Sequence, residues 1–310
     1  YPKSFYLKRG DANQKQGVAD HGVLQVLNTS PDGEQRWLET PPEGCRTSYR
    51  RRSLANWLTD TEYGAGQLLA RVIVNRLWHH HFGRGIVSTP NDFGFQGQRP
   101  SHPELLDWLA QQLIADGWSL KKMHKRMMLT ATYMQTADYD ETDGALDPEN
   151  QWQWRHTPQR LEAEVIRDAM LAVSGQLDRT MFGKGTLDER MKRRSIYFMI
   201  KRSKLIPSMQ IFDAPEPLVS AGDRPTTTIA PQALHFMNNN QVRECASAFA
   251  GQLDAASTEL AIRTAYLTAL AREPTAGELA DSVMFVEQQA KSYEADRIGN
   301  APRLALTDFC

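Results

Sequence analysis

Apolar residues recur three and four positions apart over most of the chain after residue 51, and this spacing predicts helices. Between residues 68 and 82 the apolar residues lie nearly all round the helical wheel, so this helix is expected to be buried. The predicted helices cover residues 53–58, 67–82, 103–115, 120–133, 158–174, one or two helices across 231–250, residues 259–271, and a last helix capped by Thr275 and Glu278.

Local signals mark the ends of several of these helices. Ser101 and Glu104 have the spacing of a capping box, and Ser119 is a good N-cap. Gly83 and Gly175 follow the last apolar positions of their helices and are expected to end them, because glycine adopts the left-handed conformation without strain.

Two segments depart from the helical pattern. Residues 1–50 are rich in Gly, Pro, Asp and Thr and predict an irregular lead-in or a junction with a preceding domain. Residues 195–201, SIYFMIK, predict a strand, and with it a small inserted β element around residues 190–204. The fold class expected from these patterns is mainly α.

The same patterns predict a single, mainly helical domain over residues 51–310. Within it, residues 51–180 and 231–310 are helical, and residues 181–230 form a β-containing insert. The sequence starts at Tyr1 without Met and stops at Cys310 inside an apolar-patterned stretch. We therefore expect a fragment that is truncated at both ends.

Composition excludes several classes of protein. The 310 residues are 41% hydrophobic and 24% charged with a net charge of −1, which is typical of soluble globular proteins and gives no overall preference for nucleic acid. The chain has no apolar run of about 18 residues, so no membrane span is expected. The three cysteines form no CxxC pair, which argues against a zinc ribbon or a haem attachment site. No cofactor is expected within this chain.

Polar side chains interrupt the predicted buried helix at 67–82. Arg71, Asn75 and His79 form one stripe along it, and Arg76 lies on another. Buried polar groups need partners, and Asp92 in the following loop is the nearest carboxylate in sequence for Arg71 or Arg76.

Two interpretations of this polar set stay open. In the first, the helix–loop–helix unit at 71–118 forms a pocket for an anion or a carbohydrate. In the second, Asn75, Arg76 and Asp92 only attach the loop to the helix. The ligand-binding residues predicted under the first interpretation are Arg71, Asn75, Arg76, Trp78 and His102.

The histidines of this unit do not have the spacing of a metal site. His79, His80 and His81 are adjacent on one helix, so their side chains point about 100° apart. The i, i+4 spacing of an HExxH motif is absent. No bound metal is therefore predicted.

Glu162 is the one acidic residue that falls in the apolar sector of the helix predicted from residue 158. A carboxylate in such a place is either paired with an arginine or has a raised pKa that suits acid–base chemistry. The charged residues on the opposite side, Arg160, Glu164, Arg167 and Asp168, are expected to pair with one another along the surface. Were the chain an enzyme, its candidate catalytic residues would be Asp92, Glu162 and His79.

Basic residues bracket the predicted strand. Arg193 and Arg194 precede it, and Lys201 and Arg202 follow it, with aromatic residues between them. This arrangement predicts either a rim that binds an anionic polymer such as a polysaccharide, or an ordinary solvated hairpin edge.

Several strings resemble a known family: VNRLWHHHFGRGIVSTPNDFG, PSHPELLDWLA, RRSIYF, FDAPEP and TTIAPQALHFMNN. From Trp57 to the end, the chain resembles the planctomycete-type C-terminal domain of unknown function that occurs with planctomycete cytochrome c domains. The resemblance implies a large bacterial parent that is exported to the periplasm or cell surface. It also implies a c-type haem in a separate domain, and the other domains of the same polypeptide as partners.

Three functions follow as hypotheses. The first is an uncharacterised module that binds a partner protein or a polysaccharide. The second is a carbohydrate-active enzyme with an acid/base carboxylate site near residues 71–118. The third is a docking domain for electron transfer.

Overall fold

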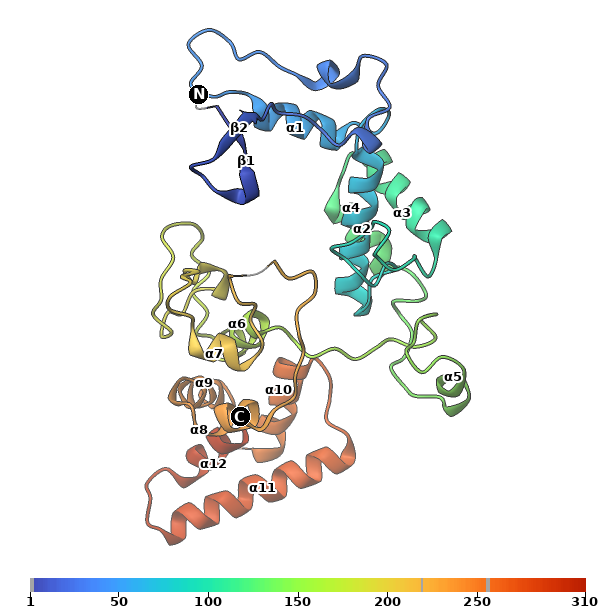
Figure 1. Cartoon of the computed structure of the whole chain (residues 1–310). Helices are drawn as coiled ribbons and strands as arrows, with labels where there is room; N and C mark the ends of the chain where they lie inside the picture. Colours follow the sequence, from blue (N-terminus) through green and yellow to red (C-terminus); the bar gives the residue numbers. More distant parts are fainter. Residues whose placement is uncertain (1–2, 219, 255–256) are drawn as a thin grey trace. The chain divides into compact units, whose positions relative to one another are not determined.

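The structure is a computed structural model that describes residues 3–218, 220–254 and 257–310. The chain forms two compact units, an N-terminal unit of Tyr1–Gln159 and a C-terminal unit of Arg160–Cys310 (Figure 1). The described residues hold twelve α-helices and one two-stranded sheet, which confirms a mainly α fold with a small β element. Within these residues, no helix has the length and apolar character needed to cross a membrane.

The N-terminal unit begins with an irregular segment, as predicted. Strands β1 and β2 pair antiparallel near its start with one short 3-10 helix between them, and two more 3-10 helices lie after β2, the second ending at Trp37. The elements of this unit are β1 (Phe5–Leu7), β2 (Lys15–Val18), α1 (Arg50–Thr59), α2 (Gly66–Phe82), α3 (Pro103–Ala115), α4 (Leu120–Met128) and α5 (Glu141–Leu146).

Helices α2, α3 and α4 enclose the core of the N-terminal unit. Val74 of α2, Leu113 of α3, and Met123 and Met127 of α4 are at most 1% exposed. The buried helix predicted at 67–82 is therefore buried along one face of α2, which carries Ala70, Val74, Trp78 and Phe82, while Arg76 and His80 are exposed. Gly83 ends α2 with a φ of 82°, as predicted.

The irregular segment is part of this unit, because Trp37 packs with Trp57 of α1 in a second apolar cluster. The Trp37 indole Nε1 donates to Asp60 Oδ2 at 2.9 Å. Burial raises the pKa of Asp60, but hydrogen bonds from the backbone of Tyr63 and Glu62, from Trp37 and from Arg36 outweigh it and hold this pKa at about 2.

The described residues of the C-terminal unit form seven helices with two main apolar clusters. One cluster joins α9, α10 and α12 around Phe249, Ala261 and Leu306, and the other joins α6 and α7 around Ala163 and Met209. The helices are α6 (Ala163–Val173), α7 (Pro207–Ile211), α8 (Ala230–Asn238), α9 (Asn240–Ala250), α10 (Thr258–Leu270), α11 (Ala276–Ala295) and α12 (Ala301–Phe309).

The region predicted as a strand at 195–201 contains a 3-10 helix, Ser195–Tyr197, and isolated bridges instead of a continuous ladder. The bridges join Asp178 to Arg193 and Thr186 to Phe198. The backbone N–H of Ser195 donates to the Asp168 carboxylate, so a side chain occupies the place of a neighbouring strand. The regular sheet lies at β1 and β2.

Most predicted helix ends agree with the structure. Thr275 and Glu278 form the predicted capping box, and the Ser119 side chain accepts from Lys122 N. The capping box predicted at Ser101 is wrong, since His102 is the N-cap of α3 and the Ser101 hydroxyl donates to Ile86 O at 3.3 Å.

Candidate functional site

Asn75 is fully buried in α2, and its side-chain amide is hydrogen-bonded to the loop that follows the helix. Its Nδ2 donates to Val87 O at 3.0 Å, and its Oδ1 accepts from Val87 N at 2.7 Å. Gly85 lies so close that a Cβ there would be 2.8 Å from Asn75 Nδ2. Arg76 also reaches this loop, donating to Asn91 Oδ1 at 2.7 Å. These contacts attach the loop to the helix.

The expected pairing of Asp92 with Arg71 or Arg76 is wrong. Arg71 Nε donates to Asp107 of α3 at 2.6 Å, because α3 packs along α2. The Asp92 carboxylate accepts from Gly94 N at 2.8 Å within its own turn. The His79 ring lies 5.6 Å from the His80 ring.

Two of the predicted ligand residues, Trp78 and His102, line a polar hollow of about 70 Å³ in the N-terminal unit. The hollow is walled by guanidinium, amide and hydroxyl groups, and Arg84 on its edge pairs with Glu149 at 2.6 Å. Its other polar lining residues are Ser88, Gln98, Arg99, Ser101, Gln151 and Gln153.

His81 forms a histidine pair with α4. Its Nε2 lies 2.8 Å from His124 Nδ1, and burial, followed by the nearby His124 and His80, lowers the pKa of His81. Across the described parts of the chain, no group of three or more His, Cys, Asp or Glu side chains is arranged to hold a metal ion.

Glu162 belongs to the C-terminal unit, at the N-cap position of α6, and it pairs with Arg224 at 3.4 Å. Its expected place in an apolar sector is wrong, because the helix begins at Ala163 and not at residue 158. Leu161 and Val165, expected in the buried face, are 54% and 46% exposed.

Arg167, expected on the solvent side of this helix, is in fact buried. Its guanidinium donates to the carbonyls of Glu189, Met191 and Arg193 and to the Ser195 hydroxyl. It also lies over the Phe198 ring, 4.7 Å from the centroid. Burial lowers the pKa of Arg167, while the nearby Asp168 opposes this shift. Arg167 therefore bonds to residues along the 189–195 segment, and Asp168 beside it on α6 also accepts from Ser195.

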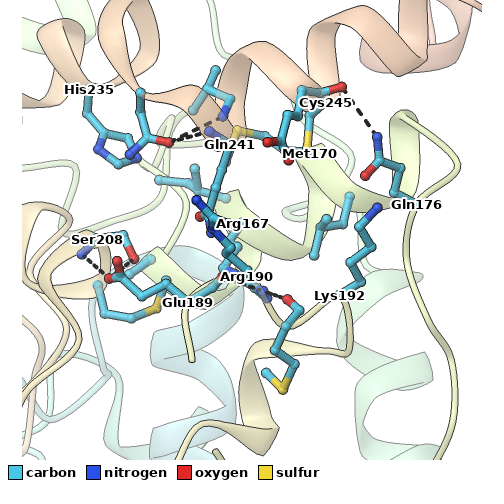
Figure 2. A pocket seen from close by; sticks show the side chains of 18 of the residues that line it. Arg167, Met170, Gln176, Glu189, Arg190, Lys192, Ser208, His235, Gln241 and Cys245 are labelled. Atoms are coloured by element: carbon cyan, nitrogen blue, oxygen red, sulfur yellow. Dashed lines mark hydrogen bonds between the residues drawn. The ribbon is translucent and has the colours of Figure 1, made fainter. Parts of the chain in front are cut away.

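A small cavity of about 50 Å³ lies between α6, this segment, α7, α8 and α9 (Figure 2). Figure 2 shows Glu189 and Ser208 on one side of Arg167, and Gln176 and Lys192 on the other. The apolar part of the wall is formed by Ala163, Ile166, Met170, Leu171, Met209, Phe212 and Val242.

A few polar groups are fixed in this apolar wall. Glu189 Oε1 accepts from Ser208 N at 3.1 Å and from Ser208 Oγ at 3.0 Å. Burial lowers the pKa of His235, and the negative charge of Glu189 opposes that shift. Cys245 contributes a half-buried free thiol. An anchored carboxylate, an imidazole and a thiol thus face one chamber.

In the part of the chain that the structure describes, the hydroxyl and the thiol of this cavity are not joined to its imidazole. Within the described ranges, neither Ser208 nor Cys245 is hydrogen-bonded to His235, so no nucleophile and base are joined. The Ser208 hydroxyl instead donates to Glu189. A mostly apolar cavity with a few fixed polar groups is typical of a ligand site.

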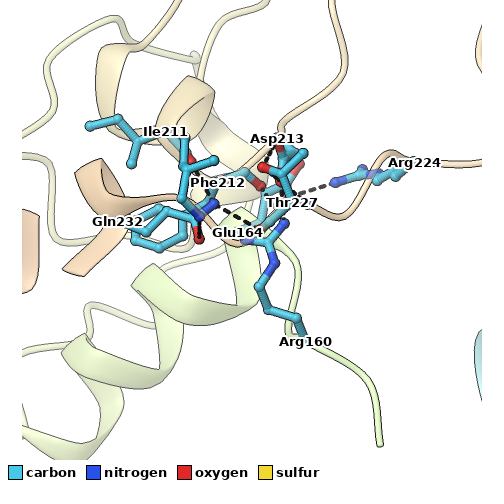
Figure 3. A network of polar contacts seen from close by, with 9 residues as sticks. Arg160, Glu164, Ile211, Phe212, Asp213, Arg224, Thr227 and Gln232 are labelled. Carbon is cyan, nitrogen blue, oxygen red and sulfur yellow. Dashed lines mark hydrogen bonds and ion pairs between the residues drawn. The ribbon is translucent and has the colours of Figure 1, made fainter. Parts of the chain in front are cut away.

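The strings FDAPEP and TTIAPQ meet in a polar network beside the cavity (Figure 3). The Asp213 carboxylate accepts from Thr227 N and Thr227 Oγ1, both at 2.9 Å, and from Arg160 at 2.5 Å. The buried Gln232 amide donates to the carbonyls of Ile211 and Thr227, at 3.0 and 3.1 Å. The Thr227 backbone N–H, ahead of the Thr227 hydroxyl and the charge of Arg160, lowers the pKa of Asp213.

This network joins the end of α7 to the start of α8. Ser208 on α7 and His235 on α8 both line the cavity. The two strings therefore position the cavity wall, which gives them a structural role next to the site.

A sequence model of the family described as PSD1, a protein of unknown function (DUF1553), matches residues 50–286. The chain belongs to this family. No curated protein and no solved structure matches it. The matched span includes every residue that lines the cavity in the C-terminal unit, so this cavity lies wholly within the family domain.

The basic residues near 193–202 differ in what they contact. Arg193 lies over the Tyr197 ring, 3.6 Å from its centroid, and Arg194 pairs with Asp168 at 3.6 Å. Lys201 and Arg202 are exposed.

Sequence reasoning missed the main residues of the cavity, namely Glu189, Ser208, His235 and Cys245. They come from four separate segments with no common spacing, so no local motif joins them. The one available signal was the repeat of Ala163, Arg167 and Leu171 at helical spacing, which places Arg167 on the same face as two apolar residues.

Proposed function

We propose that this PSD1 family chain is a binding module whose C-terminal unit takes a segment of a partner protein into the cavity beside Arg167. The observation that carries this proposal is the combination of an apolar chamber with a fixed carboxylate, Glu189. Met170 and Met209 in the wall are flexible and adapt to side chains of different shape.

The wall also indicates which segment would fit. The apolar chamber suits an apolar side chain, and the Glu189 carboxylate would accept from a backbone N–H of the ligand. Arg190 and Lys192 are exposed at the lining of the cavity and would pair with an acidic neighbour. We therefore favour a peptide with an apolar residue flanked by Asp or Glu.

A polysaccharide fits this cavity less well. Sugar rings present hydroxyl groups over most of their surface, and those groups would lose their hydrogen bonds to water against Ile166, Met209 and Phe212. Peptide binding is accordingly the stronger form of the hypothesis.

Selection of a displayed peptide library on the 310-residue chain tests the proposal. We expect the selected peptides to share an apolar residue next to an acidic one. Val242→Trp fills the cavity and should weaken their binding by at least about tenfold. Val165→Trp is the matched control, because Val165 lies on the same unit but is exposed and lies outside the cavity.

The cysteines give an independent readout. Bound peptide should protect Cys245 from thiol alkylation and leave the exposed Cys45 of the other unit reactive. Peptides that bind the Val242→Trp chain equally well would contradict the proposal. Protection of Cys245 by a neutral oligosaccharide, but by no peptide, would favour the polysaccharide hypothesis instead.

The polar hollow in the N-terminal unit supports a second candidate, carbohydrate binding. Trp78 and His102 line it together with Arg99 and three glutamines, which are the groups that pair with sugar hydroxyls or uronic acids. Replacing Arg99 and Gln98 by Ala should abolish retention on an acidic-glycan affinity gel if this candidate is right. Unchanged retention, or none by the parent chain, would contradict it.

The proposal also covers the parent polypeptide and its place in the cell. The family resemblance supports an exported bacterial parent in which this chain accompanies a c-type cytochrome domain and contacts the other domains of that polypeptide. Two alternatives stay open there, an electron-transfer docking role and a carbohydrate-active enzyme that uses Asp92, Glu162 or His79. Reduction of a purified c-type cytochrome partner by the full-length parent, with and without this domain, would test the docking role.

A further inference from the structure

Two loops of the C-terminal unit are fastened side by side next to α6. The Tyr197 hydroxyl accepts from Phe182 N at 2.6 Å, and Arg193 Nε donates to Thr180 O at 3.1 Å. Backbone bonds from Thr186 to Tyr197 and from Met199 to Thr186, at 3.1 and 2.8 Å, continue the junction. Residues 181–204, called here the 181–204 surface, therefore form one ordered patch, the yellow-green loops in Figure 1.

This surface carries large apolar side chains that point into solvent. Phe182, Ile196 and Ile200 are 77%, 71% and 81% exposed, and Met181 and Met199 are 67% and 48% exposed. Single exposed apolar residues are common, but five within two adjoining loops form a patch.

The same residues are strongly basic. They contain eight Lys or Arg and two Asp or Glu, a net charge of +6, whereas the whole chain carries −1. The rest of the chain therefore carries −7. Glu189, one of the two acids, is turned into the cavity and bonded to Ser208. The outer face is left positive, with Lys184, Lys201, Arg202 and Lys204 all exposed.

We propose that the 181–204 surface binds the surface of an anionic lipid bilayer. Bulky apolar side chains next to Lys and Arg suit the boundary between headgroups and acyl chains, where the apolar groups insert and the cations meet lipid phosphates. A soluble polyanion would satisfy the cations but would leave Phe182, Ile196 and Ile200 in water. The apolar residues therefore decide between the two partners.

Flotation with vesicles tests the proposal on the 310-residue chain. Vesicles of phosphatidylcholine with about one third phosphatidylglycerol should carry at least about tenfold more protein than pure phosphatidylcholine vesicles, because the cations need anionic lipid. Replacing Phe182, Ile196 and Ile200 together by Ser should lower this binding at least about fivefold. The double change Lys201→Glu, Arg202→Glu should do the same, and added salt should weaken the parent chain.

The matched control replaces Leu270 and Met284, which are 56% and 54% exposed in the same unit, by Ser and should leave binding unchanged. Circular dichroism checks that each variant is folded. Equal flotation with both vesicle types would overturn the proposal. So would a triple Ser variant that binds normally while heparin displaces the parent chain, since that result identifies a polyanion site.

Discussion

Asn75 in α2 and Arg167 in α6 have the same structural role in different units, since each bonds to the backbone of an irregular segment. Each is a buried polar side chain on an otherwise apolar helix face, and each fastens an irregular segment by satisfying its backbone groups. Asn75 hydrogen-bonds to the backbone of one residue, Val87, and the loop packs tightly against the Asn75 side chain. Arg167 donates to three carbonyls and a hydroxyl of the 189–195 segment, and this segment forms part of the wall of a cavity.

The difference follows from the size and charge of the two groups. A side-chain amide offers one donor end and one acceptor end, so it can replace one missing backbone neighbour. A guanidinium presents a fork of donors on a long stem, so it can hold a segment at a distance from the helix. The space between stem and segment is where the candidate site lies.

The largest effect is expected from Arg167→Ala, which leaves three carbonyls without a donor and should lower the free energy of unfolding of the C-terminal unit by about 3–5 kcal/mol. All seven tryptophans lie in the N-terminal unit. Far-UV circular dichroism should therefore show the loss while the tryptophan fluorescence transition stays in place. If the circular dichroism and fluorescence transitions shifted together, Arg167 would not act on the stability of the C-terminal unit alone.

Asn75→Leu is the corresponding change in the N-terminal unit. It keeps the volume but leaves Val87 N and O unpaired, and should cost about 2–4 kcal/mol. Urea unfolding followed by tryptophan fluorescence measures it. Arg76→Ala is the control, since it removes one exposed contact with Asn91 and should cost less than about 1 kcal/mol. Similar costs for both would show that the loop is not held by Asn75.

Asp60 should make the stability of the N-terminal unit depend on acid. Its pKa falls from 3.8 to about 2 on folding, so its contribution is complete above about pH 4 and is lost as the pH falls toward 2. The contribution is about 2 kcal/mol. Asp60→Asn should flatten the fluorescence-detected stability curve over this range, and an unchanged slope would exclude Asp60 as the cause.

The smallest effect is expected from His81→Phe. Burial lowers the pKa of His81 below 6.5, so the unfolded chain binds the proton more readily and stability is lost as the pH falls below about 6.5. The variant should show a shallower decline in fluorescence-detected midpoint between neutral and mildly acid pH. His80→Phe serves as the comparison, and an equal change in both would assign the effect to the whole triplet.

The site could be predicted from the sequence only in part. The polar residues of α2 stood out because they interrupt a helix that is apolar on all sides, and the structure gives each of Arg71, Asn75 and Arg76 a defined partner. For Arg71 that partner is Asp107, which is 36 residues away, and not the nearer Asp92. The distance along the sequence does not predict the partner of Arg71, because the packing of α3 on α2 brings Asp107 next to it.

The sequence by itself determined most of the helices, several of their caps and the mainly α class, because these depend on spacing and on residues within one turn. It did not predict α5, α7 or α12. It also carried the family strings that match over residues 50–286. Only the tertiary structure decided which face of α6 is buried and that Glu189, Ser208, His235 and Cys245 share a chamber. Those facts depend on contacts between segments far apart in the chain, which local periodicity does not encode.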